Sequence, residues 1–396
     1  MQRLKNTIRN FALVIAAAFF ILLVIEISLK LIPQGRLQNI FGDFANRNVY
    51  QNNKDLGYCL KPNLSTIFEG HRLITNSRGL RDMEYNANGK TDLKILALGD
   101  SFTFGEGVEM EETYAKVLER ILKEQYTGKN IEVINTGVPG YGNDQELQVL
   151  KKEGKYYKPD LVLFGFYVGN DFLDNQIGGI KRRRVKENGF LYDTYIEGKI
   201  DEKLKGKFPG VFLCHIDRYL KEKSLTYFLI KSRIENLLWK WGISEFYSQY
   251  AILDMENFPY FENPLPEKYK KGFELTVSII KEIKKESEKL GAEVVVVLIP
   301  AGFQVYEASL DGLMEEYHLD KKNYNMEGLN YLIAGKLGSE GITVIDLLPK
   351  LREKAKSDNG LYAWGHWKPK AHRIAAEEIY RFMETSGIVS RLKGGE

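Results

Sequence analysis

The chain has 396 residues, of which 44% are hydrophobic and 28% charged, a balance that excludes a disordered or fibrous protein. Its formal charge of +3 is small for this length, so nothing in the charge indicates nucleic acid as a partner. The two cysteines, Cys59 and Cys214, are too few and too far apart for a metal cluster or a disulfide scaffold, and whether they pair stays open.

A long apolar run lies near the N-terminus. Residues 11–25 contain no charge, and extension of the run to Ile32 approaches the roughly 20 residues that cross a bilayer as a helix. Cationic residues precede the run, which by the positive-inside rule keeps the N-terminus cytoplasmic and sends the rest outward. A cleaved signal peptide is the alternative, but the apolar residues continue past the small residues that a cleavage site needs. We expect residues 1–33 to be a transmembrane anchor, in which Glu26 pairs with Lys30.

The segment after the anchor has a different composition. Residues 34–92 are rich in asparagine, glycine and aromatic residues and lack a long helical period. They predict loops and short strands, an N-terminal extension that packs on the main domain. Residues 93–390 form that main domain, and an inserted cap region at about 172–262 interrupts its regular pattern.

The first predicted strand of the main domain leads directly into a reactive residue type. The apolar run at 93–98 predicts a buried strand, which ends on Gly99, Asp100 and Ser101. In open α/β folds the carboxyl ends of the strands are where ligands bind. Because glycine, aspartate and serine are also ordinary turn residues, this tripeptide alone indicates no more than a turn.

Strands and helices alternate beyond this point, which predicts βαβ units and a parallel sheet. Further strands are predicted at 131–134, 161–166, 294–299 and 342–345. Helices are predicted near 113–123, 145–156, 267–290 and 326–337, and from Pro369, a residue suited to a first helical turn.

The inserted region at 172–262 breaks this alternation. It contains the basic run 181–184, many aromatic residues and a helical stretch around 225–241. The basic run predicts a solvated surface loop, and steering of an anionic polymer or contact with lipid headgroups is the alternative. The aromatic residues predict the core of a cap subdomain rather than a surface that stacks on sugar rings.

The loops after the first three strands carry Ser101, Gly140 and Asn170. Acyl transfer through a serine needs a nucleophile, a base and hydrogen-bond donors for the oxyanion, and a glycine N–H and an asparagine amide are such donors. Among five histidines, His366 lies in a loop after the fifth strand, again at the carboxyl edge, and is the candidate base. His372 falls inside the following helix, where a packed or surface histidine is expected.

With these residues in order, the chain resembles the SGNH hydrolases, the superfamily that includes the GDSL esterases and lipases. Gly99-Asp100-Ser101 matches the serine block, Gly140 the glycine block, Asn170 in Gly169-Asn170-Asp171 the asparagine block, and His366 the histidine block. The resemblance implies a three-layer α/β/α domain around a five-stranded parallel sheet, in addition to the N-terminal transmembrane helix. It implies no metal or other cofactor, with Ser101 as nucleophile, His366 as base, and Ser101, Gly140 and Asn170 as the oxyanion hole.

One position departs from the family pattern. The family places an aspartate two or three residues before the catalytic histidine, where this chain has Trp364 and Ala363. Loss of the orienting acid lowers turnover by about four orders of magnitude in a well-studied protease without abolishing catalysis. Three explanations stay open: a Ser-His dyad oriented by a backbone carbonyl, an acid recruited from elsewhere such as Asp358, or a degenerate site.

The resemblance and the anchor together predict a serine-dependent acyl-ester hydrolase, a carbohydrate or small-ester esterase, acting outside the cytoplasmic membrane. An acyl ester is the expected substrate, an acetylated carbohydrate among them, and the N-terminal helix is the expected contact with the membrane. An O-acetyltransferase of envelope or extracellular polysaccharide, or a sugar-binding protein without catalysis on the same scaffold, is the alternative. The sequence does not decide whether water or a sugar hydroxyl receives the acyl group.

Overall fold

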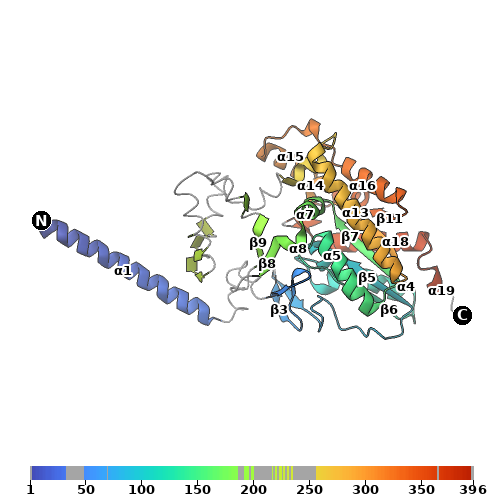
Figure 1. The fold of residues 1–396 in the computed structure, drawn as a ribbon, viewed down its shortest axis with the longest axis horizontal. Coiled ribbons are helices and arrows are strands. Elements are labelled where there is room, and N and C mark those ends of the chain that lie inside the picture. Colours follow the sequence, from blue (N-terminus) through green and yellow to red (C-terminus); the bar gives the residue numbers. More distant parts are fainter. Residues whose placement is uncertain are drawn as a thin grey trace. The chain divides into compact units, whose positions relative to one another are not determined.

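The computed structural model describes residues 2–32, 49–68, 70–185, 191–195, 256–363 and 365–393, with scattered residues between 198 and 234. The chain divides into two compact units, one of residues 1–47 with 195–252 and the other of residues 48–194 with 253–396 (Figure 1). Cys214 and Trp364 lie outside the described residues, and Cys59 is a free, half-buried thiol.

A five-stranded sheet forms the centre of the larger unit, in the order β11-β10-β7-β5-β6. All four strand pairs are parallel, which confirms the predicted fold class. The strands are β5 (Leu93–Leu98), β6 (Ile131–Asn135), β7 (Leu161–Tyr167), β10 (Glu293–Ile299) and β11 (Thr343–Asp346). Because β6 continues from β5 on one side while β7 lies on the other, the chain reverses direction across the sheet between β5 and β7. Such a switch point is where open α/β sheets bind ligands.

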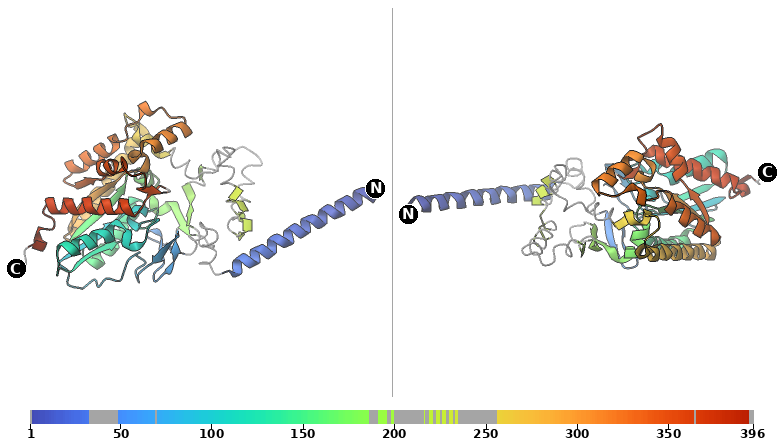
Figure 2. Two further views of the ribbon diagram at one scale, coloured as in Figure 1. Left: turned by 180° about the vertical axis from the view of Figure 1, so that it is seen from behind. Right: turned by 90° about the horizontal axis from the view of Figure 1, so that it is seen from above.

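Helices cover both faces of this sheet (Figures 1 and 2). Alternate residues of β5 enter two different hydrophobic clusters, Ile95 one and Leu96 the other, because successive strand side chains point to opposite faces. The Ile95 side is covered by α4 (Tyr114–Gln125), α17 (Leu348–Ala355) and α18 (Pro369–Thr385). The Leu96 side is covered by α5 (Asn143–Val149), α13 (Glu267–Lys289), α15 (Glu307–Glu316) and α16 (Gly328–Ser339). The result is the expected three-layer α/β/α arrangement.

Several shorter elements connect these layers. The predicted helix at 145–156 is α5 followed by a π-helical turn, η3 (Leu150–Gly154), and by α6 (Lys155–Tyr157). Other short helices include η2 (Met110–Glu112), η4 (Phe258–Phe261), α14 (Gly302–Val305), η5 (Lys321–Asn323) and α19 (Ser390–Lys393). Sequence patterns did not predict α14, α15 or α17, which are short or weakly amphipathic.

The N-terminal extension forms short strands, as predicted, and they pair in two antiparallel hairpins. They are β1 (Tyr50–Asn53) with β2 (Gly57–Leu60), and β3 (Ser65–Phe68) with β4 (His71–Ile74). Tyr58 and Leu73 are fully buried in the same hydrophobic cluster as the sheet. The extension is therefore part of the core of the larger unit.

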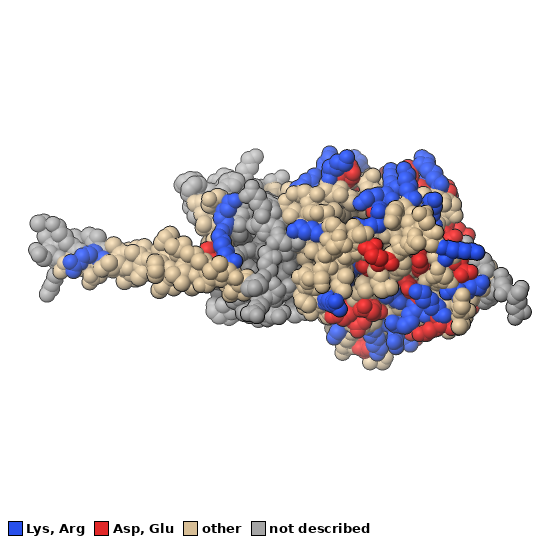
Figure 3. All heavy atoms as spheres, turned by 90° about the horizontal axis from the view of Figure 1, so that it is seen from below, with Lys and Arg blue, Asp and Glu red and all other residues tan. Residues whose placement is uncertain are grey.

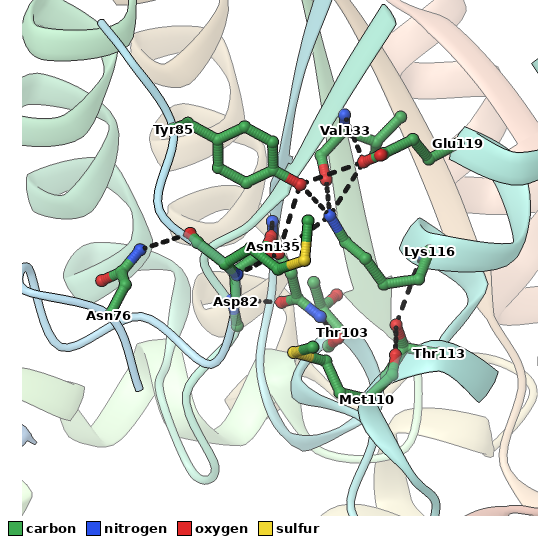
Figure 4. Close-up of polar contacts among 12 residues, drawn as sticks. Asn76, Asp82, Tyr85, Thr103, Met110, Thr113, Lys116, Glu119, Val133 and Asn135 are labelled. Carbon is green, nitrogen blue, oxygen red and sulfur yellow. Dashed lines mark hydrogen bonds and ion pairs between the residues drawn. The ribbon is translucent and has the colours of Figure 1, made fainter. Parts of the chain in front are cut away.

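A buried ionic network also joins the extension to the sheet (Figure 4). The Lys116 ammonium on α4 lies 2.9 Å from Asp82 and 2.9 Å from Glu119. The Tyr85 hydroxyl donates to Glu119 at 3.0 Å, and the backbone N–H of Asn135 at the end of β6 donates to Asp82 at 2.7 Å. We call Asp82, Tyr85, Lys116 and Glu119 the Lys116 network.

The smaller unit contains α1 (Gln2–Leu31), whose residues 9–31 are long and apolar enough to cross a membrane; a signal sequence passes the same test. On the face in view in Figure 3, the middle of this helix carries no charged side chains. Glu26 forms the expected ion pair with Lys30 at 3.0 Å. It also accepts hydrogen bonds from the Ser224 hydroxyl at 2.9 Å and the Thr226 N–H at 2.8 Å, so Glu26 also holds a segment of the inserted region.

Candidate active site

The strand β5 delivers Ser101 to a tight turn at the switch point. Asp100 caps the short helix α3 (Ser101–Phe104) by accepting a hydrogen bond from the Phe102 N–H at 2.9 Å. Gly99 has a φ of +153°, and a Cβ there would lie 2.1 Å from the Thr103 hydroxyl. Only glycine fits this position, because any side chain would displace the helix that carries Ser101.

The turn after Ser101 is held from two sides. The N–H groups of Gly105 and Glu106 both donate to the Ser101 carbonyl, at 2.9 and 3.0 Å. The buried Arg81 guanidinium donates to the carbonyls of Gly105 and Val108, each at 2.6 Å. An arginine of the N-terminal extension therefore fixes the loop that carries the candidate nucleophile.

His366 reaches Ser101 from a hairpin at the other end of the domain sequence. The strands β12 (Tyr362–Ala363) and β13 (His366–Trp367) pair antiparallel, and His366 Nε2 lies 2.8 Å from Ser101 Oγ. The imidazole ring lies 5.2 Å from the Phe102 ring, centroid to centroid, and is partly exposed. At 2.8 Å the imidazole is within range to take the hydroxyl proton.

Gly140 and Asn170 follow β6 and β7 at the same edge of the sheet. Gly140 has a φ of +75°, a left-handed conformation that favours glycine. Among the described residues, the N–H groups of Ser101 and Gly140 bond no backbone acceptor, and the side-chain amide of Asn170 has a buried Oδ1 without a partner. These three groups are donors of the kind that stabilises an oxyanion. Asn170 precedes α7 (Asp171–Ile177) and does not cap it with its side chain.

Asp358, named as one acid that could be recruited, has partners other than His366. Asp358 forms an ion pair with Lys370 and accepts a hydrogen bond from the Gly360 N–H at 2.7 Å. Ala363 lies directly opposite His366 in the hairpin, so the local position of the family aspartate holds a methyl group.

Glu106 is an acid near the base that the sequence reasoning missed. Its Oε2 lies 4.0 Å from His366 Nε2, the same nitrogen that contacts Ser101. The signal for it was available in the sequence: Gly105 and Gly107 flank Glu106 and form a turn that brings it back towards Ser101. Both glycines have positive φ, at +82° and +80°.

A second group of acids lies buried close to the nucleophile turn. Asp100, Glu146 and Asp171 are at most 1% exposed, and the Asn143 amide donates to both Glu146 and Asp171, at 2.9 and 3.1 Å. Burial raises the pKa of Asp100 to about 7 and places the pKa values of Glu146 and Asp171 well above their ordinary range. We call Asp100, Glu146 and Asp171 the acid cluster.

His372 has a structural role, as its place inside a helix indicated. It is 1% exposed, and its Nδ1 accepts a hydrogen bond from the Tyr114 N–H at 3.2 Å. Burial lowers the pKa of His372 to about 3, so the ring is neutral at physiological pH. A neutral Nδ1 acceptor is what the start of α4 requires.

The basic run is only partly the solvated loop that its sequence predicted. Lys181 and Arg184 are exposed, but Arg182 is 3% exposed and Arg183 is half-buried. The prediction is wrong for Arg182 because acidic partners from two other segments, Asp174 and Asp193, compensate its charge.

No family model matches the chain, and no curated protein matches it. Several solved structures align with about three quarters of the chain, at TM-scores below 0.5. TesA is 12% identical over 74% of this chain and 98% of its own, with a TM-score of 0.38. A catalytic mutant of Axe2, an acetylxylan esterase from Geobacillus stearothermophilus, is 13% identical over 74% of this chain and 94% of its own, with a TM-score of 0.39. A lipolytic protein of the G-D-S-L family from Veillonella parvula is 12% identical over 74% of this chain and 98% of its own, with a TM-score of 0.37.

Proposed function

We propose that the protein is a serine-dependent acyl-ester hydrolase with Ser101 as the nucleophile and His366 as the base. The observation that carries this proposal is the 2.8 Å separation of His366 Nε2 and Ser101 Oγ, between residues 265 positions apart in the sequence. A hydroxyl in such contact with an imidazole, at the switch point of an open sheet, is the arrangement that nucleophilic catalysis needs.

The geometry supports a two-step reaction. Ser101 Oγ attacks the ester carbonyl carbon while His366 Nε2 takes the hydroxyl proton, and the carbonyl oxygen becomes an oxyanion. The N–H groups of Ser101 and Gly140 and the amide of Asn170 donate to that oxyanion. Collapse of this intermediate breaks the ester C–O bond, and the alcohol leaves with the proton from Nε2. Water then gives a proton to Nε2 as its oxygen attacks the acyl-Ser101 carbonyl. Collapse of this second intermediate breaks the bond to Ser101 Oγ, which takes the proton back from Nε2, so that the acid leaves and the free serine is restored.

Glu106 supplies the negative charge that the family aspartate would supply elsewhere. When His366 takes the proton, its imidazolium has the Glu106 carboxylate 4.0 Å from Nε2. An opposite charge at this distance stabilises the protonated ring. Glu106 comes from the nucleophile's own loop and lies beside Nε2, so it supplies charge and not the orienting contact considered for Asp358.

The membrane and substrate assignments belong to the same proposal. The apolar helix α1 anchors the enzyme with its N-terminus in the cytoplasm, and the larger unit acts outside the membrane on an acyl ester. The cationic residues before the apolar run support this orientation. The resemblance to SGNH hydrolases makes an O-acetylated carbohydrate the first substrate to test.

The test compares full-length wild-type protein in detergent with Ser101→Ala and His366→Gln, with p-nitrophenyl acetate and an acetylated xylooligosaccharide as substrates. Acetate release that Ser101→Ala abolishes, and that His366→Gln lowers by about 10³-fold or more, supports the proposal. Equal rates in wild type and Ser101→Ala would overturn it. An acceptor sugar added to the same reactions shows whether the acetyl group passes to a hydroxyl in place of water.

A further inference from the structure

The residues that surround the Gly140 loop include three side chains with no role in the chemistry above. Tyr58 comes from β2 of the N-terminal extension, whereas Arg182 and Arg183 come from the basic run. Arg182 ends the short helix α8 (Gly179–Arg182), and Arg183 begins β8 (Arg183–Val185), which pairs with β9 (Leu191–Asp193). All three are buried or half-buried; Tyr58 and Arg183 make hydrogen bonds to the Gly140 loop, and Arg182 makes one to the helix that follows Asn170.

Tyr58 holds the peptide whose N–H is one of those donors. Its hydroxyl donates to the Pro139 carbonyl at 2.7 Å. The Pro139 carbonyl and the Gly140 N–H belong to one planar trans peptide, in which the C=O and N–H point in opposite directions. A hydrogen bond that fixes the carbonyl therefore fixes the direction of the Gly140 N–H. Burial raises the pKa of Tyr58 to about 12, so the hydroxyl stays protonated and donates.

Arg183 holds the next peptide along the chain. Its Nη1 donates to the Gly140 carbonyl, and a Cβ on Gly140 would lie 1.9 Å from that nitrogen. The guanidinium therefore packs directly on the Gly140 backbone. With Tyr58 on the preceding carbonyl, both peptides that flank the Gly140 Cα are tied.

Arg182 holds the helix that follows the other donor, Asn170. Its Nη1 donates to Asp174 on α7, the helix that begins directly after Asn170, and its Nε donates to Asp193 at 2.7 Å. Arg183 Nε also lies 3.4 Å from Asp193, so one carboxylate of β9 fixes both arginines. The neighbouring residues Arg182 and Arg183 thus connect the loop after β6 with α7, the helix that follows Asn170.

We propose that Tyr58, Arg182 and Arg183 are positioning residues that aim the Gly140 N–H and the Asn170 amide at the oxyanion. This role rests on the proposed function. Buried guanidinium groups bonded to carbonyls and carboxylates are costly to form, and pre-oriented donors are what transition-state stabilisation requires. The basic run is therefore a structural clamp on the site, and only its outer residues, Lys181 and Arg184, face solvent.

The test uses full-length Tyr58→Phe and Arg183→Met, with Arg184→Met as the matched control from the same run. We expect each of the first two variants to lower kcat about tenfold with KM little changed, because the contact matters in the transition state. Affinity for a phenylboronic acid, which forms a tetrahedral adduct on a serine, should fall by the same factor. Arg183→Lys should recover part of the lost kcat, and Arg184→Met should match wild type.

Two results would overturn the clamp: unchanged kcat in both variants, or a change confined to KM. Hydrogen exchange separates this failure from failure of the proposed function. If wild type shows no Ser101-dependent turnover, the proposed function fails. The rate of amide hydrogen exchange in peptide 137–142 then tests whether Tyr58 and Arg183 hold the loop. Faster exchange in Tyr58→Phe and Arg183→Met than in Arg184→Met supports the holding of the loop, and equal exchange contradicts it.

Discussion

Two groups of buried acids lie close to the sheet, and they differ in whether a cation accompanies them. In the Lys116 network, Asp82 and Glu119 share one ammonium at 2.9 Å each. In the acid cluster, no described lysine or arginine pairs with Asp100, Glu146 or Asp171, and each carboxyl keeps one buried oxygen that accepts no hydrogen bond from described residues. The Lys116 network is therefore a structural contact in which a cation compensates the buried negative charges.

The acid cluster has no such compensating cation among the described residues. Uncompensated burial costs free energy, and proteins tolerate that cost mainly where a site requires it. Asp100 precedes the candidate nucleophile, and Asp171 follows the candidate oxyanion donor Asn170. Raised pKa values keep part of this cluster neutral, which spares the developing oxyanion a nearby negative charge.

The largest expected effect lies in the compensated network. Lys116→Met leaves Asp82 and Glu119 buried without their cation, and we expect it to lower the free energy of unfolding by about 3–5 kcal/mol. Urea unfolding at neutral pH measures this change. The control is Lys123→Met, which removes an ion pair to the same Glu119 from a side chain that is 45% exposed. The control should cost less than about 1 kcal/mol. If the two variants lower the free energy of unfolding equally, the Lys116 network is not a buried ionic contact that the fold depends on.

The second prediction concerns pH and the acid cluster. Asp100 has a pKa of about 7 in the folded protein, above the value of about 4 expected in the unfolded chain. The protonated Asp100 carboxyl therefore contributes its full stabilisation of the fold below about pH 4, and this contribution is lost as the pH rises through about 7. Asp100→Asn keeps the acceptor for the Phe102 N–H and removes the titration. We expect the variant to gain stability relative to wild type by the order of 3 kcal/mol between pH 4 and pH 8.

Urea unfolding of both proteins at several pH values checks this difference. A pH dependence that is the same in Asp100→Asn and wild type would mean that Asp100 is ionised in the fold. The comparison between compensated and uncompensated acids would then lose its basis.

The third prediction concerns Glu106, an acid of neither group, partly exposed and close to the base. Glu106→Gln removes the charge 4.0 Å from His366 Nε2 and keeps the side-chain size. We expect kcat to fall about tenfold, or about 1.4 kcal/mol in activation free energy, with stability nearly unchanged. The matched control is Glu111→Gln, at an exposed position five residues on in the same loop region. If both variants keep wild-type kcat, Glu106 contributes no catalytic charge.

Much of the fold followed from local patterns. The apolar runs at 93–98 and 161–166 became β5 and β7 because buried parallel strands are almost continuously hydrophobic. Ser101 and His366 were also identified correctly as neighbours, because strands of a parallel sheet bring their carboxyl ends to one edge. These inferences need only periodicity and chain direction.

The rest depended on tertiary partners. Arg182 has the sequence of a solvated cation and is buried because Asp174 and Asp193 converge on it, which no local pattern records. Tyr58 lies 81 positions before the Pro139 carbonyl that it holds. Glu106 differs from these, because the two glycines that flank it are a local signal for a turn, which the sequence reasoning did not use.

The central claim is that His366 activates Ser101 as a nucleophile. Its most direct test is covalent labelling with a p-nitrophenyl phosphonate ester, followed by mass spectrometry of the digested full-length protein. We predict that one phosphonyl group is added to Ser101, that Ser101→Ala takes up none, and that His366→Gln reacts at least about a hundredfold more slowly. Labelling of another residue, or an equal rate in His366→Gln, would contradict the account.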